Sequence, residues 1–406
     1  MNALQETMTQ HAVTHPAGTS ATAGPSTYVE ELTLTAFRCY RSAALSLDAR
    51  PVVLTGSNGA GKTNCLEAVS LLAPGRGLRG AELRELIRTP AGGSAADAGA
   101  PQTVVAARVV HDGRPVRIGT AVEPTAQGFR RIVRIDGAPV PAQKLGHLVR
   151  AVWLTPTMDR LFLEGASGRR RFLDRLALSA LPDHAGHVAA YERAMRDRQR
   201  LLRDGGGDAQ WFAALDATMA ERGVAIAAGR SHIIERLTEA LMARADSAFP
   251  SAVLELAGDV ERALRTSKAD ALAAEIRTRL ADGRRRDGEA GRALYGPHRS
   301  DLVVHHGGTG RLAQSCSTGE QKALLIAIVL AHGRALKEDA GAAPLLLFDE
   351  IAAHLDETRR LALFEEIRAM DCQAWLTGTD RALFAPMGAE AQHFAVAEGR
   401  VLSVLG

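Results

Sequence analysis

The sequence is poor in cysteine and in aromatic residues. Its 406 residues include four cysteines, and Phe, Trp and Tyr together make up 4% of the chain. The cysteines are far apart and form no C-x-x-C pair; they are Cys39, Cys65, Cys316 and Cys372. A disulfide framework or a zinc site is therefore not expected, and a reducing cytoplasm fits this composition. So few aromatic residues also leave little material for stacking on single-stranded bases.

Long apolar runs are also missing. No stretch of about 18 apolar residues occurs, so we expect neither a membrane-spanning helix nor a membrane partner. Residues 1–26 are polar and lack the basic start and apolar stretch of a secretory signal, which predicts a disordered tail. The net charge of +3 is too small to indicate nucleic-acid binding by itself.

The clearest pattern that is present is a phosphate-binding loop. It fits G-x-x-x-x-G-K-[ST] and consists of Gly56, Ser57, Asn58, Gly59, Ala60, Gly61, Lys62 and Thr63. A short apolar run precedes it and helical spacing follows it, which is the strand–loop–helix context that the motif needs. Backbone N–H groups of the loop would surround a phosphate. Lys62 would neutralise the β- and γ-phosphates and the Thr63 hydroxyl would hold Mg²⁺. A glycine-rich turn that matches by accident is the alternative.

The order of patterns predicts an α/β protein. Strands are indicated at 28–35, 44–47, 104–110, 116–122 and 131–135, with turns at Asp112-Gly113 and Asp136-Gly137. From about residue 161 to 280 the spacing is helical. Strand patterns return at 344–350 and 374–377, and a closing hairpin is indicated around Glu398-Gly399. We therefore expect a tail (1–26), an ATPase lobe (27–160), an α-helical insertion lobe (161–290) and a second ATPase lobe (291–406).

Three acidic residues follow the apolar run that begins at Pro344. Asp349 is placed to contact the Mg²⁺ shell, and Glu350 to polarise an attacking water. Their alternative role is to cap the element that follows. Asp356 stands six residues further on, and its alternative is a helix N-cap.

Residues 315–322 form a serine-led segment that precedes the apolar helical run at 323–330. Its Ser and Gly residues at a helix N-terminus predict a second anion-binding end. The other interpretation is plain capping, with Ser317 as N-cap and Glu320 three residues on. The two interpretations are compatible.

These motifs together resemble those of ABC-type ATPases. Residues 56–64, Ser317-x-Gly319-Glu320-Gln321, and Leu345–Glu350 with Leu355-Asp356 are similar to the Walker A, signature, Walker B and D-loop motifs. Asn58 and Asn64 resemble the SMC and RecF branch more than transporter ATPases. Three further stretches resemble the RecF family of bacterial recombination proteins: residues 32–38, 165–174 and 295–302. The resemblance runs from about residue 28 to the C-terminus.

The resemblance implies a two-lobed head that dimerises on ATP. Each ATP would bind between the phosphate loop of one chain and the signature residues of the other, so that Ser317, Gly319, Gln321 and Asp356 belong to the shared site. Asp349 and Glu350 would serve slow hydrolysis that acts as a switch. The family also implies binding to duplex and gapped DNA near single-strand/double-strand junctions. It implies assistance to RecO and RecR in loading RecA, and support of the SOS response.

Arginines are concentrated between residues 169 and 203. Permanently charged, bidentate guanidinium groups suit a grip on the duplex backbone, without sequence specificity. The candidates are Arg169, Arg170, Arg171, Arg198, Arg200 and Arg203. A solvated helix face is the alternative, and residues 169–171 could instead lie beside ATP.

Three rival functions make different demands on the chain. A transporter ATPase subunit would need a membrane partner. An SMC-like bridging protein would need a coiled-coil arm far longer than the roughly 120-residue insertion provides at ~1.5 Å per residue. A nucleotide switch acting only on protein partners would not bind DNA.

Overall fold

The computed structural model of the chain describes residues 25–88, 103–205, 208–244 and 247–404. Nearly all of the predicted tail lies outside the described residues. The chain forms two compact units, one of residues 1–158 with 333–406 and the other Asp159–His332. The second unit extends past residue 290, where we expected the helical lobe to end. The signature-like segment therefore belongs to this unit.

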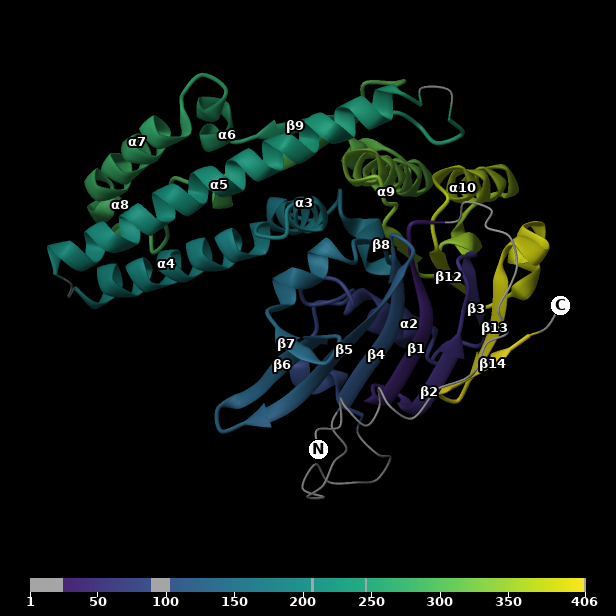
Figure 1. Cartoon of the computed structure of the whole chain (residues 1–406). Coiled ribbons are helices and arrows are strands. Elements are labelled where there is room, and N and C mark those ends of the chain that lie inside the picture. Colours follow the sequence, from purple (N-terminus) through teal and green to yellow (C-terminus); the bar gives the residue numbers. More distant parts are fainter. Residues whose placement is uncertain (1–24, 89–102, 206–207, 245–246, 405–406) are drawn as a thin grey trace. The chain divides into compact units, whose positions relative to one another are not determined.

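The first unit contains two six-stranded sheets, the first of them antiparallel throughout (Figure 1). Its order is β2-β1-β4-β5-β6-β7, and the strands are β1 (Thr27–Phe37), β2 (Tyr40–Ser46), β4 (Thr103–His111), β5 (Arg114–Thr125), β6 (Gly128–Ile135) and β7 (Ala138–Val140). Asp112 and Gly113 both have positive φ, as do Asp136 and Gly137. The two predicted tight turns are confirmed, because primed two-residue turns need this geometry.

The second sheet is parallel except at one edge. Its order is β14-β13-β3-β12-β11-β8, and the strands are β3 (Val52–Thr55), β8 (Ala151–Leu154), β11 (Leu345–Phe348), β12 (Ala374–Gly378), β13 (Gln392–Ala397) and β14 (Arg400–Ser403). Only β14 runs antiparallel to its neighbour, across the predicted turn at Glu398-Gly399. The carboxyl ends of β3 and β11 therefore meet at one edge of the sheet, which is where ligands bind in such folds.

The helix after the phosphate loop lies in the core of the first unit. Seven of the nine residues of α2 (Lys62–Ser70) are buried. Leu66 and Val69 join one apolar cluster with Leu34 of β1 and Leu54 of β3, so both sheets hold the helix in place. The unit also contains α10 (Glu357–Met370) and the short helices η1 (Leu83–Leu86), η2 (Ala142–His147), η6 (Ala352–His354) and η7 (Arg381–Glu390). η3 (Pro156–Arg160) and α9 (Thr318–Ala340) span the two boundaries between the units.

The second unit is mainly helical but also contains a small sheet. Its helices are α3 (Ala166–Ala180), α4 (His184–Asp204), α5 (Ala209–Met242), α6 (Asp259–Leu264), α7 (Ala269–Asp282) and α8 (Arg284–Glu289), with the short η4 (Pro297–Arg299) and η5 (Ala313–Ser315). β9 (Ala252–Ala257) pairs antiparallel with β10 (Asp301–His306), a small sheet that the sequence patterns did not indicate. Figure 1 shows α4 and α5 side by side, and both contribute to one apolar core.

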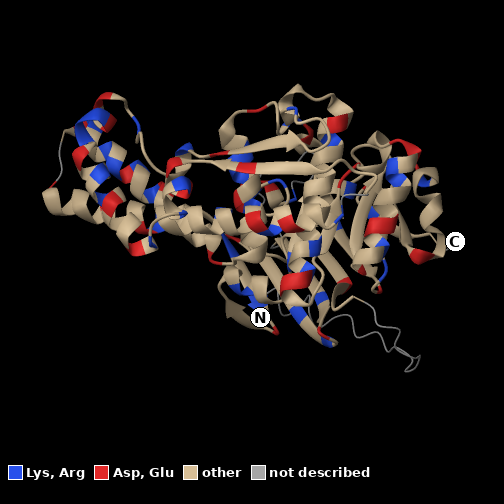
Figure 2. Cartoon of the chain, turned by 90° about the horizontal axis from the view of Figure 1, so that it is seen from above, with Lys and Arg blue, Asp and Glu red and all other residues tan. Residues whose placement is uncertain are grey.

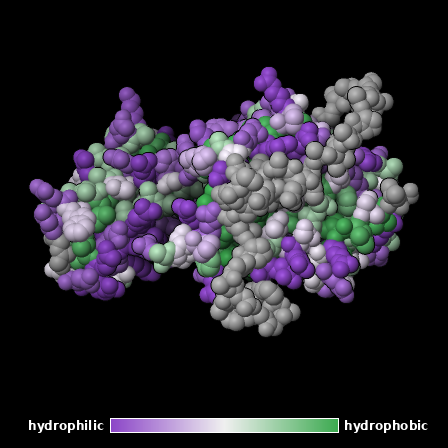
Figure 3. All heavy atoms as spheres, turned by 60° about the horizontal axis from the view of Figure 1, so that its bottom comes forward, coloured by the Kyte–Doolittle hydropathy of each residue, from purple (hydrophilic) through white to green (hydrophobic). Residues whose placement is uncertain are grey.

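No helix in the described ranges combines the length and the apolar character that a bilayer crossing requires. In Figure 3, hydrophilic side chains spread across the visible face, and hydrophobic ones occur between them in small groups.

Candidate functional site

The phosphate loop is shaped by glycines that no other residue could replace without strain. Gly61 has a φ of 120°, and a Cβ there would lie 2.8 Å from both Tyr40 Oη and Cys39 Sγ. A Cβ on Gly56 would lie 2.1 Å from the carbonyl oxygen of Val396. Since both distances are too short for a carbon atom, the close packing of the loop against β2 and β13 requires glycine at these positions.

Lys62 curls back over the loop that precedes it. Its side chain is 4% exposed, and Nζ donates to the carbonyl oxygens of Gly56 at 2.9 Å and Ser57 at 3.1 Å. The same Nζ lies 3.1 Å from Glu350 Oε1. The ammonium is therefore held at the loop, with one carboxylate as its charged partner.

Thr63 and Asp349 form a set of oxygen atoms that fits Mg²⁺. The Thr63 hydroxyl lies 2.9 and 3.0 Å from the two carboxylate oxygens of Asp349. Thr377 donates a further hydrogen bond to Asp349 Oδ1 at 2.8 Å. Burial raises the pKa of Asp349, and the neighbouring Glu350 carboxylate raises it further. Negative charge gathered on hard oxygen ligands suits a small divalent cation.

Glu350 is held in an uncommon backbone conformation. Its φ is 53°, in the left-handed region that residues other than glycine seldom adopt. Its N–H donates to Thr377 Oγ1 at 2.8 Å. The Thr377 hydroxyl thus fixes both acidic residues that follow β11, Asp349 through its carboxylate and Glu350 through its backbone N–H. Strain of this kind is found at functional sites.

One cavity of about 420 Å³ collects these groups. It is lined by Asn58, Gly59, Gly61, Lys62, Thr63, Asn64, Arg79, Pro156, Asp349, Glu350 and His354. Eight of these are predicted site residues. The predicted residues Gly56, Ser57 and Ala60 are absent from the lining, although Gly56 and Ser57 hold Lys62 through their carbonyl oxygens.

Arg79 is a further lining residue that lies outside the predicted motifs. Its Nη1 donates to Asn64 Oδ1 at 2.9 Å and lies 3.5 Å from the buried Glu67 carboxylate. Arg38 makes a bidentate pair with the same carboxylate. Pro156 and His354 also line the cavity and were missed, because neither belongs to a motif.

The serine-led segment forms the capping box that the sequence offered as one interpretation. Ser317 N donates to Glu320 Oε2 at 2.7 Å, and Glu320 N donates to Ser317 Oγ at 3.3 Å. Hydrogen bonds from the backbone and hydroxyl of Ser317 lower the pKa of Glu320. Gln321 is buried and donates to the carbonyl oxygen of Cys316, whereas a Cβ on Gly319 would meet no atom within 4 Å.

Asp356 is the N-cap of α10, which is the alternative role that we gave it from the sequence. Its side chain accepts a hydrogen bond from Arg359 N at 2.8 Å. It does not line the phosphate-loop cavity of its own chain.

Comparison with known proteins identifies the family. A model of the RecF/RecN/SMC N-terminal domain matches residues 28–399. The chain is 48% identical over 377 residues to the DNA replication and repair protein RecF of Rhizobium etli, covering 92% of this chain and 98% of the relative. The RecF protein of Mesorhizobium japonicum is 47% identical, covering 92% and 97%. The RecF protein of a Caulobacter species is 48% identical, covering 90% and 96%.

The chain belongs to the RecF family. The resemblance drawn from the motifs is thereby confirmed. Two solved structures, of the recombination mediator protein RecF-ATPrS and RecF-ATP in the RecFOR pathway, share the fold with a TM-score of 0.76. Their sequence identities are 21% and 22%, and each covers 94% of this chain. The predicted ABC/SMC-type P-loop ATPase fold is confirmed as well.

Arg198, one of the arginines expected to contact DNA, is buried in this RecF-family chain. The Arg198 side chain is 1% exposed. It donates to Asp216 and Asp287 at 2.7 Å each, and to the carbonyl oxygen of Leu280 at 2.7 Å. A buried guanidinium with two carboxylate partners cannot reach a phosphate, so the expectation for Arg198 was wrong.

The other candidate arginines are more accessible, but most have acidic neighbours. Arg169 pairs with both oxygens of Asp301, and Arg170 donates to the carbonyl oxygen of Ser300. Arg171 is exposed. Arg200 and Arg203 are 61% and 74% exposed, each within 3.3 Å of an aspartate. Figure 2 shows the same mixture on the helices at its left, where blue and red segments of the ribbon are interspersed.

Proposed function

We propose that this RecF-family chain binds ATP with Mg²⁺ in the phosphate-loop cavity and hydrolyses it slowly. The main support is that the Thr63–Asp349 contact and the Lys62–Glu350 pair lie in one cavity. Lys62 would neutralise the terminal phosphates, while Thr63 and Asp349 would hold Mg²⁺. Such a cation supplies neutralisation of charge that develops on the phosphates.

The Lys62–Glu350 pair suggests how binding would prepare the site. The ammonium is satisfied by two loop carbonyls and the Glu350 carboxylate. A triphosphate would compete for the same ammonium. The Glu350 carboxylate would then be free to orient a water molecule, which is the positioning that phosphoryl transfer requires.

We further propose an ATP-dependent homodimer. Exposed groups at the N-terminus of α9 support it, because a capped helix end still presents backbone N–H groups and partial positive charge to an anion. Ser317, Gly319 and Gln321 of one chain would reach the triphosphate held by the other, with Asp356 beside it. ATP would then favour the dimer, and hydrolysis would release it.

The cellular role proposed is recombinational repair and replication restart in the cytoplasm. The relatives are named DNA replication and repair proteins, and the solved neighbours are named mediators of the RecFOR pathway. We therefore propose binding to duplex and gapped DNA, including single-strand/double-strand junctions. The family role includes assistance to RecO and RecR in loading RecA, and support of the SOS response. Arg171, Arg200 and Arg203 are the most accessible candidates for phosphate contact, with Arg169 and Arg170 next.

Sedimentation of the purified protein with gapped DNA, ATP and Mg²⁺ tests this proposal. We expect co-sedimentation of a dimer with the DNA, which weakens without nucleotide and with rising salt, because phosphate contacts release counterions. Failure to bind gapped or duplex DNA under low-salt conditions with ATP would contradict the DNA-binding role.

The acidic partners of the arginines favour a second candidate. An ABC-type ATPase subunit, or a nucleotide switch that acts only on protein partners, needs no DNA surface. Filter binding with plasmid DNA, with and without ATP, separates the two, since only the first function retains DNA.

A further inference from the structure

A second and larger cavity lies at the β14 edge of the parallel sheet. Its volume is about 840 Å³, and it shares no lining residue with the phosphate-loop cavity. It is lined by residues of β2, the loop before β3, η7, β13 and β14, and by two residues that flank these elements: Ser46, Arg50, Arg381, Ala382, Ala385, Gly388, Ala389, Ala391, Gln392, His393, Phe394, Ser403 and Val404. We name it the Arg50–Arg381 pocket.

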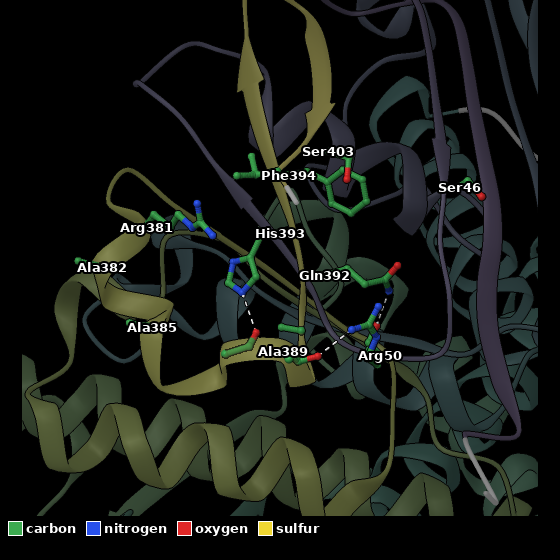
Figure 4. Close-up of a pocket in the computed structure, with 13 residues that line it drawn as sticks. Ser46, Arg50, Arg381, Ala382, Ala385, Ala389, Gln392, His393, Phe394 and Ser403 are labelled. Carbon is green, nitrogen blue, oxygen red and sulfur yellow. Dashed lines mark hydrogen bonds between the residues drawn. The ribbon is translucent and has the colours of Figure 1, made fainter. Parts of the chain in front are cut away.

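The charges that line this pocket are all of one sign. Arg50 and Arg381 are cationic, and no carboxylate is among the lining residues. Arg50 pairs with Asp48 outside the pocket and donates to the carbonyl oxygen of Ala389 at 2.7 Å. Arg381 has no acidic partner within the described residues. Its guanidinium points toward His393, with Arg50 on the other side of the pocket (Figure 4).

His393 adds an unused polar atom between the two arginines. Its Nε2 lies 3.2 Å from the carbonyl oxygen of Gly388, a contact in which the ring nitrogen must be the donor. Nδ1 is buried and has no hydrogen-bond partner in the described structure. Burial lowers the pKa of His393, and the positive charges of Arg381 and Arg50 lower it further. An anion in the pocket would offset those positive charges and favour the imidazolium form of His393.

The remaining lining suits an extended peptide better than a nucleic acid. Short apolar side chains and Phe394 form much of the surface, which gives an alternating chain a place for its apolar residues. β14 is also an edge strand. Val404 N bonds to the carbonyl oxygen of His393, so the alternation of an antiparallel ladder turns the backbone groups of Val401 and Ser403 away from β13. Free edge groups pair readily with an added strand.

We propose that the Arg50–Arg381 pocket binds an extended acidic segment of a partner protein. One carboxylate of the segment lies between Arg381 and Arg50, and its apolar residues contact the alanines and Phe394. This interaction is separate from nucleotide binding and from any contact with DNA.

A fluorescent peptide of alternating Asp and Leu is the probe, measured by anisotropy at low salt. The peptide with Asn in place of Asp is its uncharged control. We expect Arg381→Ala to weaken binding of the acidic peptide about tenfold, the loss of one charge-assisted contact. Arg400→Ala, at an exposed arginine of β14 outside the pocket, should leave binding unchanged. Lys62→Ala should also leave it unchanged, which separates this result from the fate of the proposed ATPase.

A second readout reports the position of the peptide. In an NMR titration, binding should raise the pKa of His393, because the added carboxylate stabilises the imidazolium. The proposal is overturned by equal binding of the Asn peptide, by equal losses in Arg381→Ala and Arg400→Ala, or by no binding of the acidic peptide. A short DNA duplex that displaces the peptide from the wild type, but not from Arg381→Ala, would show that the pocket binds nucleic acid instead.

Discussion

At the scale of single residues, the contacts of Lys62 show which features of a motif residue can be predicted from the sequence. The sequence predicts a lysine that reaches phosphates, and the structure shows which groups hold its ammonium. Three oxygens hold Nζ, two from loop carbonyls and one from Glu350. The carbonyl contacts depend on the path of the loop, which the motif implies. The Glu350 contact joins residues 288 positions apart, and local spacing cannot predict it.

Lys62→Ala should weaken ATP binding by about 100-fold, since loss of one member of a desolvated charge pair costs about 2–5 kcal/mol. Equilibrium binding of a fluorescent ATP analogue measures this. Lys144→Ala, at an exposed lysine of η2, is the matched control and should bind normally. Undiminished affinity in Lys62→Ala would show that the cavity is not the ATP site.

Asp174 gives the helical unit a pH dependence. Burial acts to raise the pKa of Asp174, but hydrogen bonds from His184 and Arg230 outweigh it and hold the pKa below its ordinary value. A depressed carboxyl pKa stabilises the fold above the unfolded pKa, and this contribution is lost as pH falls through the folded pKa.

Asp174→Asn should therefore lower the free energy of unfolding at pH 7 by about 3 kcal/mol, as breaking a buried pair does. The deficit should shrink below about pH 4, where the Asp174 carboxyl of the unfolded wild type becomes protonated and the folded-state pKa is approached. Urea unfolding at a series of pH values measures both. A deficit that stays constant down to pH 3 would mean that lost packing, rather than lost charge, causes it.

At the scale of elements, the phosphate loop is predictable because its constraints are local. Gly61→Ala combines a positive φ with contacts of 2.8 Å to Tyr40 and Cys39. It should destabilise the protein by about 2–4 kcal/mol. Gly59→Ala is the control, since its Cβ would meet no atom within 4 Å. Thermal unfolding compares the two, and equal losses would show that backbone strain alone, without the close packing, sets the requirement.

Turns and strands were predictable to different degrees for a physical reason. Asp112-Gly113, Asp136-Gly137 and Glu398-Gly399 form tight turns because Gly adopts positive φ at little cost. β8 was missed since its four residues acquire their strand character from pairing with β11, which lies far along the chain. β9 and β10 were missed for the same reason.

Arg198 joins four helices of the second unit through Asp216, Asp287 and the carbonyl of Leu280. Arg198→Met should cost about 3–5 kcal/mol, because two buried carboxylates lose their partner. Arg203→Met, 74% exposed, should change stability by no more than about 0.5 kcal/mol. Guanidinium unfolding monitored by circular dichroism tests the contrast. Similar stability of the two variants would contradict the structural role given to Arg198.

At the scale of the whole molecule, the sequence predicted the family, the fold class and eight of the residues that line the phosphate-loop cavity. It did not separate structural arginines from accessible ones, because composition does not reveal which carboxylate folds against which guanidinium. Arg198 and Arg203 lie in the same arginine-rich stretch, but the Arg198 side chain is 1% exposed and the Arg203 side chain 74%. The pairing of Ser317 with Glu320 was predictable, since capping is local. Its proposed second role depends on another chain and stays a prediction.

The shared ATP site is the central claim, and sedimentation velocity of Glu350→Gln tests it most directly. With ATP and Mg²⁺ this variant should retain nucleotide and sediment as a dimer, because slow turnover leaves the bridging γ-phosphate in place. Adding Ser317→Arg should return it to a monomer that still binds ATP. A Glu350→Gln protein that stays monomeric with saturating ATP, or a double variant that still dimerises, would contradict the account.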